Sequence, residues 1–338
     1  MKAFIYGAGN GLRVYPFSIQ NAKMLLPIFG VPVVKIQLKM LETFGITDIG
    51  LIFSKDNDGQ LANICNEFPN LEIQLLKVQA DHAQAWRAIS NNYHNHNDVL
   101  VINSDIIFSL NWLKNLNNTY NFADTLFFAC DNSIIDDGQE GQQIWYTLTS
   151  EGKIKNYSLI SIDQYLTANE IGISKLPYDF FDKITLSDER QNVDYWYDYF
   201  VPLLFKTSNV AFYLSRDFWK DIGTWRRYQK IHLDILDYKA EGLEYLLDDF
   251  LVFDKRNCVH ISSSHNEEVQ YGQNSVIFKN VKIGKRTVIT ESIIGENVTI
   301  GDDCRVEDCI VLENSILNSH TSIGHKIIDG DKQYDRKD

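Results

Sequence analysis

The sequence predicts an α/β fold, in which a mostly parallel sheet with helices on both faces is followed by a short parallel β-helix. In the N-terminal part of the chain, short apolar runs alternate with segments of helical periodicity, a pattern typical of parallel sheets. Closer to the C-terminus, apolar residues recur every six positions, which is typical of the coils of a β-helix.

The N-terminal elements follow one another in a regular order. We expect buried strands at residues 2–6, 48–53, 72–76 and 99–103, and helices at 31–44, 83–93 and around 110–117. Residues 124–215 are less regular and contain strand-like pieces, so we expect a subdomain that is inserted into the sheet or continues it. Ligands of such sheets bind at the carboxyl ends of the strands.

Residues 271–330 are predicted to form the β-helix, which we expect to be left-handed. About three coils fit into the periodic stretch at three hexapeptides per turn. Sandwich strands are the alternative, but clear hairpin turns are lacking. The six-residue series contains Ile277, Ile283 and Ile289 and, after a slip of one residue, Ile294, Ile300, Val306 and Leu312. Residues 1–235 would then form the α/β domain, 236–270 a connecting segment and 331–338 a charged tail that frays.

Composition and charge exclude several classes of protein. The chain has 338 residues, 44% of them apolar, which is enough for two domains with a sizeable core. The formal net charge is -13 and no Lys/Arg block is present, which disfavours nucleic-acid and anionic-membrane partners. The N-terminus has no signal peptide and no run approaches the roughly 20 apolar residues of a membrane span, so we expect a cytoplasmic location. The five cysteines lack zinc-ligand spacing.

A glycine-rich turn follows the first predicted strand. Glycines let the backbone turn tightly and approach a ligand, and successive N–H groups in such a turn can bind an anion. Arg13 and Lys23 add two cations, of which arginine suits phosphate oxygens through its planar fork. The residues of this predicted phosphate-binding turn are Gly7, Ala8, Gly9, Asn10 and Gly11.

Two other phosphate-binding motifs do not fit this turn. A dinucleotide-binding fingerprint needs glycine where Leu12 stands and a helix that opens directly from the glycines. Pro16 would lie inside that helix and break it. The triphosphate loop of P-loop proteins needs Gly-Lys-Ser/Thr, which is absent from the turn.

The segment resembles the motif of the sugar-phosphate nucleotidyltransferases, G-G-x-G-T-R-L-x-P-L-T followed by P-K-x-L-L-P-V-x-x-K-P. Arg13, Lys23 and Pro27 match it, whereas Leu12 replaces a threonine and Val31 a lysine. The resemblance implies a Rossmann-like sheet and a Mg²⁺-dependent transfer between a nucleoside triphosphate (NTP) and a sugar 1-phosphate. It also implies that the turn holds the triphosphate, Arg13 assists the departing pyrophosphate and Lys23 neutralises the reacting phosphates.

Two aspartates are candidate metal ligands. Asp105 lies in N-S-D directly after the strand VLVIN, and Asp221 lies in W-K-D-I-G-T. The family resembled has N-G-D and W-x-D-I-G-T there, and its two aspartates hold a magnesium ion together. Carboxylate, water and phosphate oxygens are the ligands that Mg²⁺ prefers. A helix N-cap or a turn is the alternative role for an aspartate after a strand.

The base and the sugar are less well defined. Gln79 and His82 lie in a segment that resembles the nucleobase loop of the thymidylyl- and uridylyltransferases, although His82 could equally be a surface residue at a helix start. Gly172 lies in N-E-I-G-I-S, which resembles the sugar-side strand. The family's E-K-P triplet, whose lysine holds the sugar phosphate, is missing. Lys175, like Lys153 or Lys155, could substitute for it or be an ordinary solvated lysine.

The favoured interpretation is therefore an enzyme that makes a nucleotide sugar and pyrophosphate from an NTP and a sugar 1-phosphate. A non-catalytic homologue that binds a nucleotide sugar and regulates a partner is the alternative, motivated by the missing lysine. An additional acyltransferase on the β-helix is disfavoured, because about three coils and a lone His320 or His325 offer little for such a site. We expect a homo-oligomer, assembled through the β-helix. The base and the sugar stay open.

Overall fold

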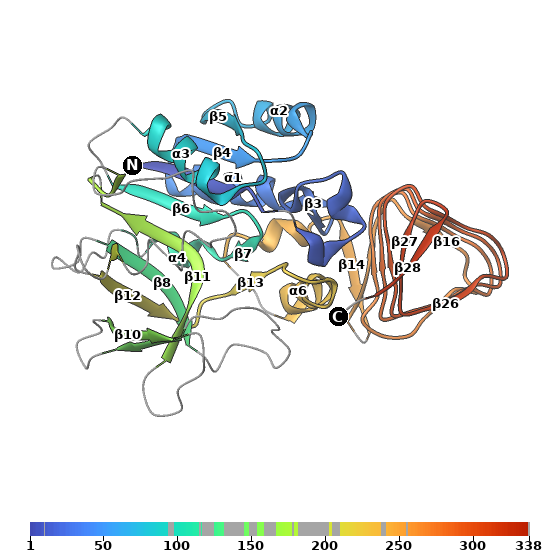
Figure 1. Cartoon of the computed structure of the whole chain (residues 1–338). Helices are drawn as coiled ribbons and strands as arrows, with labels where there is room; N and C mark the ends of the chain where they lie inside the picture. Colours follow the sequence, from blue (N-terminus) through green and yellow to red (C-terminus); the bar gives the residue numbers. More distant parts are fainter. Residues whose placement is uncertain are drawn as a thin grey trace. The chain divides into compact units, whose positions relative to one another are not determined.

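The chain forms two compact units in the computed structural model (Figure 1). The sheet unit comprises Met1–Asn10, Gln20–Met24 and Val34–Lys220, and the β-helix unit comprises Gly11–Ile19, Leu25–Val33 and Asp221–Asp338. The structure describes residues 1–9, 11–93, 98–114, 116, 125–131, 145–148, 154–158, 167–177, 179–181, 203–204, 210–237, 241–254 and 256–336. The glycine-rich turn is shared between the two units, since Gly11 begins a segment of the second.

A mixed sheet forms the sheet unit, with its strands in the order β10-β9-β11-β6-β1-β4-β5. The predicted parallel strands are confirmed for β6, β1, β4 and β5, whereas β11 runs antiparallel to β6. The bounds are β1 Lys2–Gly7, β4 Asp48–Phe53, β5 Glu72–Lys77, β6 Val99–Asn103, β9 Trp145–Leu148, β10 Ile154–Ser158 and β11 Thr167–Leu176.

Further strands extend this sheet beyond β11. Strand β8 (Thr125–Asp131) pairs antiparallel with β11 and parallel with β12 (Val210–Ser215). Strand β7 (Ile106–Phe108) pairs with β13 (Trp219–Asp221) in a separate two-stranded sheet. The described strands of the irregular region therefore continue the sheet, as one of the two expectations had it.

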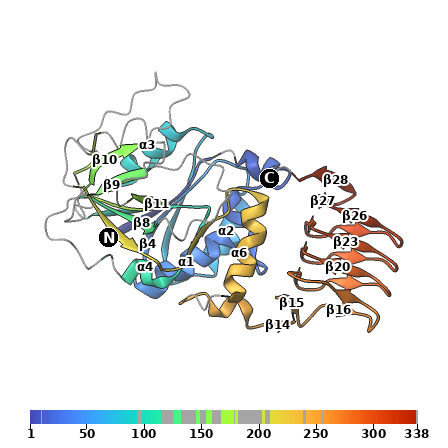
Figure 2. The same cartoon turned by 90° about the horizontal axis from the view of Figure 1, so that it is seen from below.

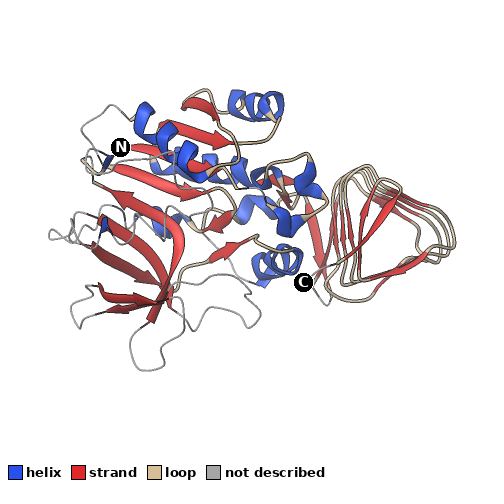
Figure 3. Cartoon of the chain, in the orientation of Figure 1, coloured by secondary structure: helices blue, strands red, loops and turns tan. Residues whose placement is uncertain are grey.

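Helices cover the parallel strands (Figure 3). They are α1 (Val33–Phe44), α2 (Asp58–Asn66), α3 (His82–Asn92) and α4 (Leu110–Lys114). The helix α1 starts later than predicted because Val31 and Pro32 form strand β3, which pairs with β2 (Pro27–Ile28) in a hairpin. Helix α2 was not predicted from the sequence.

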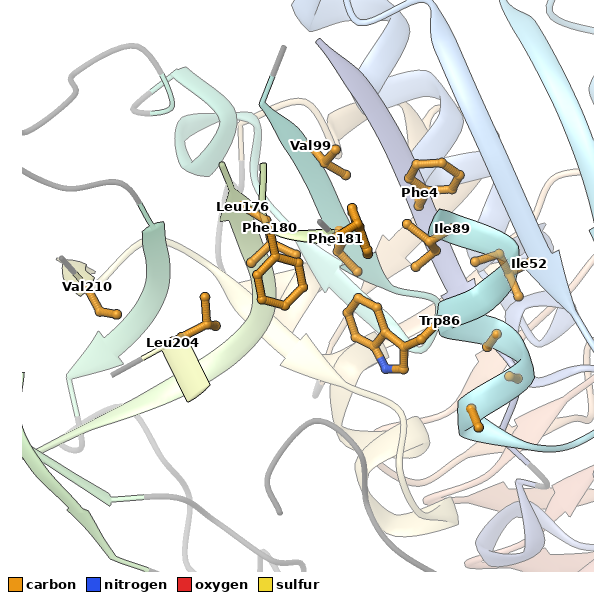
Figure 4. Packing of buried hydrophobic residues seen from close by; sticks show 14 residues of the cluster. Phe4, Ile52, Trp86, Ile89, Val99, Leu176, Phe180, Phe181, Leu204 and Val210 are labelled. Carbon is orange, nitrogen blue, oxygen red and sulfur yellow. The ribbon is translucent and has the colours of Figure 1, made fainter. Parts of the chain in front are cut away.

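One apolar cluster fixes α3 on the sheet (Figure 4). Successive side chains of a strand point to opposite faces, so Phe4 of β1 and Val99 and Val101 of β6 share one face. Trp86 and Ile89 of α3 pack on that face. The alternate residues Ala3, Ile5, Leu100 and Ile102 are fully buried as well. Both faces are thus covered, as expected of a parallel sheet.

The β-helix unit stacks short strands into coils (Figure 2), and each coil has three sides (Figure 1). The first side contains β14 (Phe250–Phe253), β15 (Asn257–His260), β18 (Val276–Ile277), β21 (Ile293–Ile294), β24 (Ile310–Val311), β27 (Lys326–Asp329) and β28 (Lys332–Asp335). The second contains β16 (Ser264–His265), β19 (Lys282–Ile283), β22 (Thr299–Ile300) and β25 (Ile316–Leu317). The third contains β17 (Gln270–Tyr271), β20 (Val288–Thr290), β23 (Arg305–Glu307) and β26 (Ser322–Gly324).

The predicted β-helix is confirmed, with two differences in detail. Its first coil begins at β15, inside the segment expected to be a connector, because Cys258 pairs with Val276. From Val276 onward, one side of each coil has five residues instead of six, because Val276 pairs with Ile293 and Ile293 with Ile310. The inward residue after Val306 is therefore Val311, which is buried. The prediction of Leu312 was wrong at this position, because it continued the six-residue spacing across the short side.

The charged tail is ordered over most of its length. Strand β28 pairs antiparallel with β27, and Tyr334 packs edge-on against Tyr15, with ring centroids 5.3 Å apart. Arg336 forms an ion pair with Asp308, and its side chain is only 5% exposed. The expectation that the tail frays is therefore wrong for residues 332–336, since the hairpin supplies backbone partners that the sequence does not reveal.

Helix α6 (Trp225–Asp237) joins the N-terminal segments of the β-helix unit to its coils. The Trp225 indole donates a hydrogen bond to the Tyr15 carbonyl (2.7 Å), and the Tyr228 hydroxyl donates to the Pro27 carbonyl (2.7 Å). His232 accepts from the Phe29 N–H through Nε2 (3.3 Å), and its ring lies tilted against that of Phe278 in the coils, with centroids 5.6 Å apart. The segment that contains Arg13 is thus anchored to α6.

Candidate functional site

Gly7 is the point where the first strand meets the predicted phosphate-binding elements. A Cβ on Gly7 would lie 2.1 Å from the Met24 methyl group, 2.7 Å from the Ile52 carbonyl oxygen and 3.0 Å from the Ser104 hydroxyl. Only glycine leaves room for this approach. The end of β1 therefore lies directly beside the neighbours of Lys23 and Asp105.

Lys23 and Asp105 form an ion pair at this point. The Lys23 ammonium nitrogen lies 2.9 Å from Asp105 Oδ2, and the two side chains are 13% and 28% exposed. Asp105 follows β6, whose carboxyl end lies beside that of β1 in the parallel sheet. The structure thus brings together Gly7, Lys23 and Asp105 at the edge where such sheets bind ligands.

Two buried amides hold this arrangement, and sequence reasoning missed both. The Gln37 amide nitrogen donates to the Asn103 and Ile106 carbonyls (2.8 and 3.0 Å), which fixes the turn that carries Asp105. The Asn57 side-chain oxygen Oδ1 accepts from the Ala22 N–H (2.9 Å), which fixes the residue before Lys23. Fully or almost fully buried amides in an apolar core are unusual, but their burial is known only from the fold, so the sequence offered no signal for them.

The remaining residues of the glycine-rich turn differ in their surroundings. A Cβ on Gly9 would meet no atom within 4 Å, whereas Gly11 has a left-handed φ of 66°. Ala8 is buried, and Asn10 lies outside the described residues. Arg13 is exposed, in the 3-10 helix η1 (Leu12–Val14) that follows Gly11.

The second aspartate is held in the β-helix unit by an arginine that the sequence did not indicate. Arg227 Nη1 lies 2.7 and 2.8 Å from the two carboxylate oxygens of Asp221, and the Gly223 N–H donates to Oδ1 (2.7 Å). The Arg13 guanidinium carbon lies 3.5 Å from the position of a Cβ on Gly223. Asp221, Arg227 and Arg13 therefore gather around the glycine of W-K-D-I-G-T.

Both candidate metal ligands are partly buried carboxylates, which is the donor chemistry that Mg²⁺ requires. Each carboxylate already accepts from a cation, Asp105 from Lys23 and Asp221 from Arg227. Mg²⁺ is commonly held by one or two carboxylates together with substrate phosphates, and the phosphates would also offer oxygens to the displaced cations. The residues fit a metal that binds together with a nucleotide.

The predicted base-binding residues lie around the end of β1. His82 starts α3, and its Nδ1 lies 2.6 Å from the Tyr6 hydroxyl, with the two rings stacked. Gln79 and Gln84 form a reciprocal pair, in which the Gln84 amide donates to Gln79 Oε1 (3.1 Å) and accepts from the Gln79 N–H (3.2 Å). His82 is therefore an exposed residue whose imidazole ring is held by Tyr6. The motif did not indicate Tyr6.

The two predicted sugar-side residues lie at different ends of β6. A Cβ on Gly172 would lie 2.5 Å from the Asn103 amide nitrogen, and its φ of 76° also favours glycine. Gly172 thus lies beside the N-S-D motif. Lys175 forms an ion pair with Asp98 (2.8 Å), which precedes the first residue of β6. The side chain of Lys155 and all of Lys153 lie outside the described residues.

Two protein families match different parts of the chain. Residues 2–133 match the nucleotidyl transferase family, and residues 261–338 match the GlmU-like C-terminal hexapeptide family. The N-terminal part of the chain is therefore similar to nucleotidyl transferases, and the C-terminal part is similar to GlmU-like hexapeptide proteins. The resemblance seen in the sequence is thereby confirmed.

The relatives carry more particular names. A glucose-1-phosphate adenylyltransferase of Desulfitobacterium hafniense is 25% identical over 46% of this chain and 43% of its own length. A bifunctional sugar-1-phosphate nucleotidylyltransferase/acetyltransferase of Sulfurisphaera tokodaii is 27% identical over 66% of this chain and 52% of its own length. The chain thus spans about half the length of these relatives. By name they belong to the sugar-1-phosphate nucleotidyltransferases.

A solved structure shows the same fold. It comes from Bacillus anthracis and is classed with the glucose-1-phosphate thymidylyltransferases. The superposition has a TM-score of 0.56 at 19% identity and covers 70% of this chain and 96% of that one. None of the helices within the described residues is long and apolar enough to cross a membrane.

Proposed function

We propose that the protein transfers a nucleoside monophosphate from an NTP to a sugar 1-phosphate in the presence of Mg²⁺. A phosphate oxygen of the sugar 1-phosphate attacks the α-phosphorus, the bond from that phosphorus to the bridging oxygen breaks, and pyrophosphate leaves. The carrying observation is the ion pair between Lys23 and Asp105 at the Gly7 turn, because it combines a phosphate-binding cation with a metal-type carboxylate. The names of the relatives support the sugar 1-phosphate as acceptor.

Each polar residue of the site has a role in this proposal. The backbone N–H groups of residues 7–11 bind phosphate oxygens, and Lys23 neutralises the charge of the reacting phosphates. Arg13 stabilises the pyrophosphate that leaves. Asp105 and Asp221 would hold Mg²⁺, which would supply neutralisation of the negative charge that develops on the phosphates. The attacking phosphate is already ionised, so positioning and charge neutralisation account for the rate.

The shared role of the two aspartates has support from the sheet unit. The Phe218 carbonyl, three residues before Asp221, accepts hydrogen bonds from the Ser109 N–H (3.0 Å) and the Trp112 indole (3.1 Å). Ser109 follows Asp105 by four residues. The two segments that lead to the aspartates are therefore tied to each other, which is what joint metal binding requires.

The remaining residues concern the base and the sugar. Gln79 and His82 would contact the base, with His82 oriented by Tyr6. Gly172 would let the sugar approach β11 beside Asn103. Lys175 is engaged by Asp98 in the structure, and we assign the sugar phosphate to no single lysine.

A non-catalytic nucleotide-sugar-binding regulator is the second candidate. Two observations favour it, the missing E-K-P triplet and the Arg227 guanidinium that occupies both oxygens of Asp221. In that function the same site would bind a nucleotide sugar without turnover.

Pyrophosphate release across the common NTPs and sugar 1-phosphates, with Mg²⁺, separates the two candidates. We expect release with at least one pair and its loss in Asp105→Asn, whereas Asp58→Asn, a carboxylate exposed beside Lys77, leaves it unchanged. Thermal unfolding with each nucleotide and nucleotide sugar accompanies the assay, since a bound ligand raises the melting temperature. Stabilisation by a nucleotide sugar without release for any pair would support the regulator.

A further inference from the structure

Two arginine side chains converge on Gly223, the glycine of W-K-D-I-G-T. A Cβ at this position would lie 2.9 Å from Arg227 Nη1 and 3.5 Å from the guanidinium carbon of Arg13. Asp221 supplies one carboxylate to this cluster, through its contacts with Arg227. Like charges repel one another at short range, so two guanidinium groups beside one carboxylate favour the binding of a further anion.

The guanidinium group of Arg227 uses only part of its hydrogen-bonding capacity. Both contacts with Asp221 come from Nη1, at 2.7 and 2.8 Å. The Nε atom is buried and has no hydrogen-bond partner. In an arginine, Nε and Nη2 form a planar fork that matches two oxygens of a phosphate group. A buried donor without a partner is destabilising, so a ligand oxygen that reaches Nε would stabilise the protein.

The surroundings of Arg227 allow its side chain to change partner. The side chain is 15% exposed, so a ligand in solvent can reach part of it. Its backbone N–H donates to Thr224 Oγ1 (3.3 Å) in the first turn of α6, where the helix dipole also favours an anion. Asp221 keeps a hydrogen bond from the Gly223 N–H (2.7 Å) when Arg227 leaves. Neither partner therefore needs the ion pair to stay in place.

We propose that Arg227 exchanges Asp221 for the phosphate tail of the nucleotide, which it binds together with Arg13. This inference rests on the proposed function, in which Arg13 contacts the pyrophosphate part of the NTP. Turning the fork of Arg227 toward phosphate oxygens gives the buried Nε a partner and frees both oxygens of Asp221 for the metal ion. A polyanion such as pyrophosphate offers enough oxygens for two guanidinium groups. The ion pair with Asp221 is the state of the protein before the nucleotide binds.

Binding of inorganic pyrophosphate in metal-free buffer tests this role, because no metal ion then bridges the ligand to the aspartates. Isothermal titration calorimetry gives the dissociation constant. Arg227→Met should raise it by at least about tenfold, and Arg227→Lys, which keeps the charge beside Asp221 but has no fork, by at least about threefold. Arg226→Met and Arg226→Lys are the matched controls, since Arg226 is exposed in the same helical turn, and both should bind as the wild type does.

A double-mutant cycle separates the exchange of partners from simple repulsion. Asp221→Asn holds the guanidinium group less strongly, so it should raise the metal-free affinity for pyrophosphate. If Asp221 only repelled the anion, this gain would be equally large in the Arg227→Met background. In the exchange that we propose, most of the gain depends on Arg227 and is absent from that background. Equal gains in the two backgrounds would overturn the exchange.

The binding experiment and the turnover assay fail in different ways. Pyrophosphate binding that depends on Arg227, without turnover for any substrate pair, would contradict the proposed transfer and support Arg227 as a phosphate ligand. Turnover with wild-type pyrophosphate affinity in both Arg227 variants would overturn the role of Arg227 alone, as would a wild-type protein that does not bind pyrophosphate. Urea unfolding of each variant shows that binding is measured on folded protein.

Discussion

The two aspartates that the sequence singled out are held in different ways in the two units. In the sheet unit, Asp105 meets Lys23, a lysine that belongs to the same motif as the glycine-rich turn. In the β-helix unit, Asp221 is held on both oxygens by Arg227, which no motif indicated, and by the Gly223 N–H. The first pair is the arrangement expected of a phosphate site. The second fixes the orientation of the carboxylate. Under our proposal, Lys23 would act on the phosphates of the substrate, whereas Arg227 would orient a metal ligand.

The largest difference between the two pairs concerns activity. Lys23→Met should lower kcat by at least about 10²-fold, because about 3 kcal/mol of charge stabilisation is lost in the transition state. The free energy of unfolding should change little by comparison, since Asp105 is partly exposed and can be solvated. The measurement is steady-state pyrophosphate release beside urea unfolding. Lys35→Met, which removes a surface pair with Glu67, serves as the control. A Lys23→Met variant with the wild-type kcat would contradict a catalytic role for Lys23.

The anchoring of the β-helix unit should show in the pH dependence of stability. Burial lowers the pKa of His232 to about 4, so the ring is neutral in the folded protein at neutral pH. An unfolded histidine has a pKa of about 6.5. The folded pKa is the lower one, so this contribution is complete above pH 6.5 and is lost as the pH falls toward 4. The loss amounts to about 3 kcal/mol at the acid end.

Urea unfolding between neutral pH and pH 4 measures this contribution. His232→Asn should be less stable near neutrality and should lose less stability on acidification than the wild-type protein. His320→Asn, which replaces an exposed histidine, should keep the wild-type slope. Equal slopes for the His232 variant and the wild type would show that His232 is not the group that titrates.

Removing Arg227, which contacts both carboxylate oxygens of Asp221, should lower the free energy of unfolding more than Lys23→Met does. Arg227→Met leaves the partly buried Asp221 with one donor fewer, at a cost of about 2 kcal/mol. The same change should raise the affinity of the protein for Mn²⁺ in the absence of nucleotide, since Arg227 no longer competes for the carboxylate. Arg226→Met, an exposed neighbour on α6, provides the control for both readouts. If Arg227→Met were as stable as the wild type and had unchanged Mn²⁺ affinity, the proposed difference between the Lys23–Asp105 and Arg227–Asp221 pairs would be contradicted.

The β-helix was the more predictable of the two units. Each of its coils repeats the same local pattern, so the spacing of Ile277, Ile283 and Ile289 sufficed to identify it. The five-residue side misled the prediction at Leu312, because a fixed period cannot show where a corner is shortened. The order of the tail was also missed, since Arg336 depends on Asp308, a partner far away in the sequence.

Residues of the candidate site could be predicted from the sequence only where they belong to a recognisable motif. Lys23 and Asp105 were each singled out by a motif, and their side chains form an ion pair. Gln37, Asn57 and Arg227 were not found, because each acts through a hydrogen bond whose meaning depends on the fold. A buried glutamine on a helix and an arginine in a first helical turn have no spacing that distinguishes them from ordinary residues.

The binding of Mn²⁺ together with NTP tests the central claim, that Asp105 and Asp221 hold one ion with the triphosphate. Electron paramagnetic resonance can follow Mn²⁺ release in the wild-type protein, in Asp105→Asn, in Asp221→Asn and in the double variant. We expect each single variant to lose at least about tenfold in affinity for Mn²⁺. The double variant should bind Mn²⁺ no more weakly than the single variant with the larger loss, because both residues serve the same ion. Losses that multiply, or no loss in one single variant, would contradict a shared site.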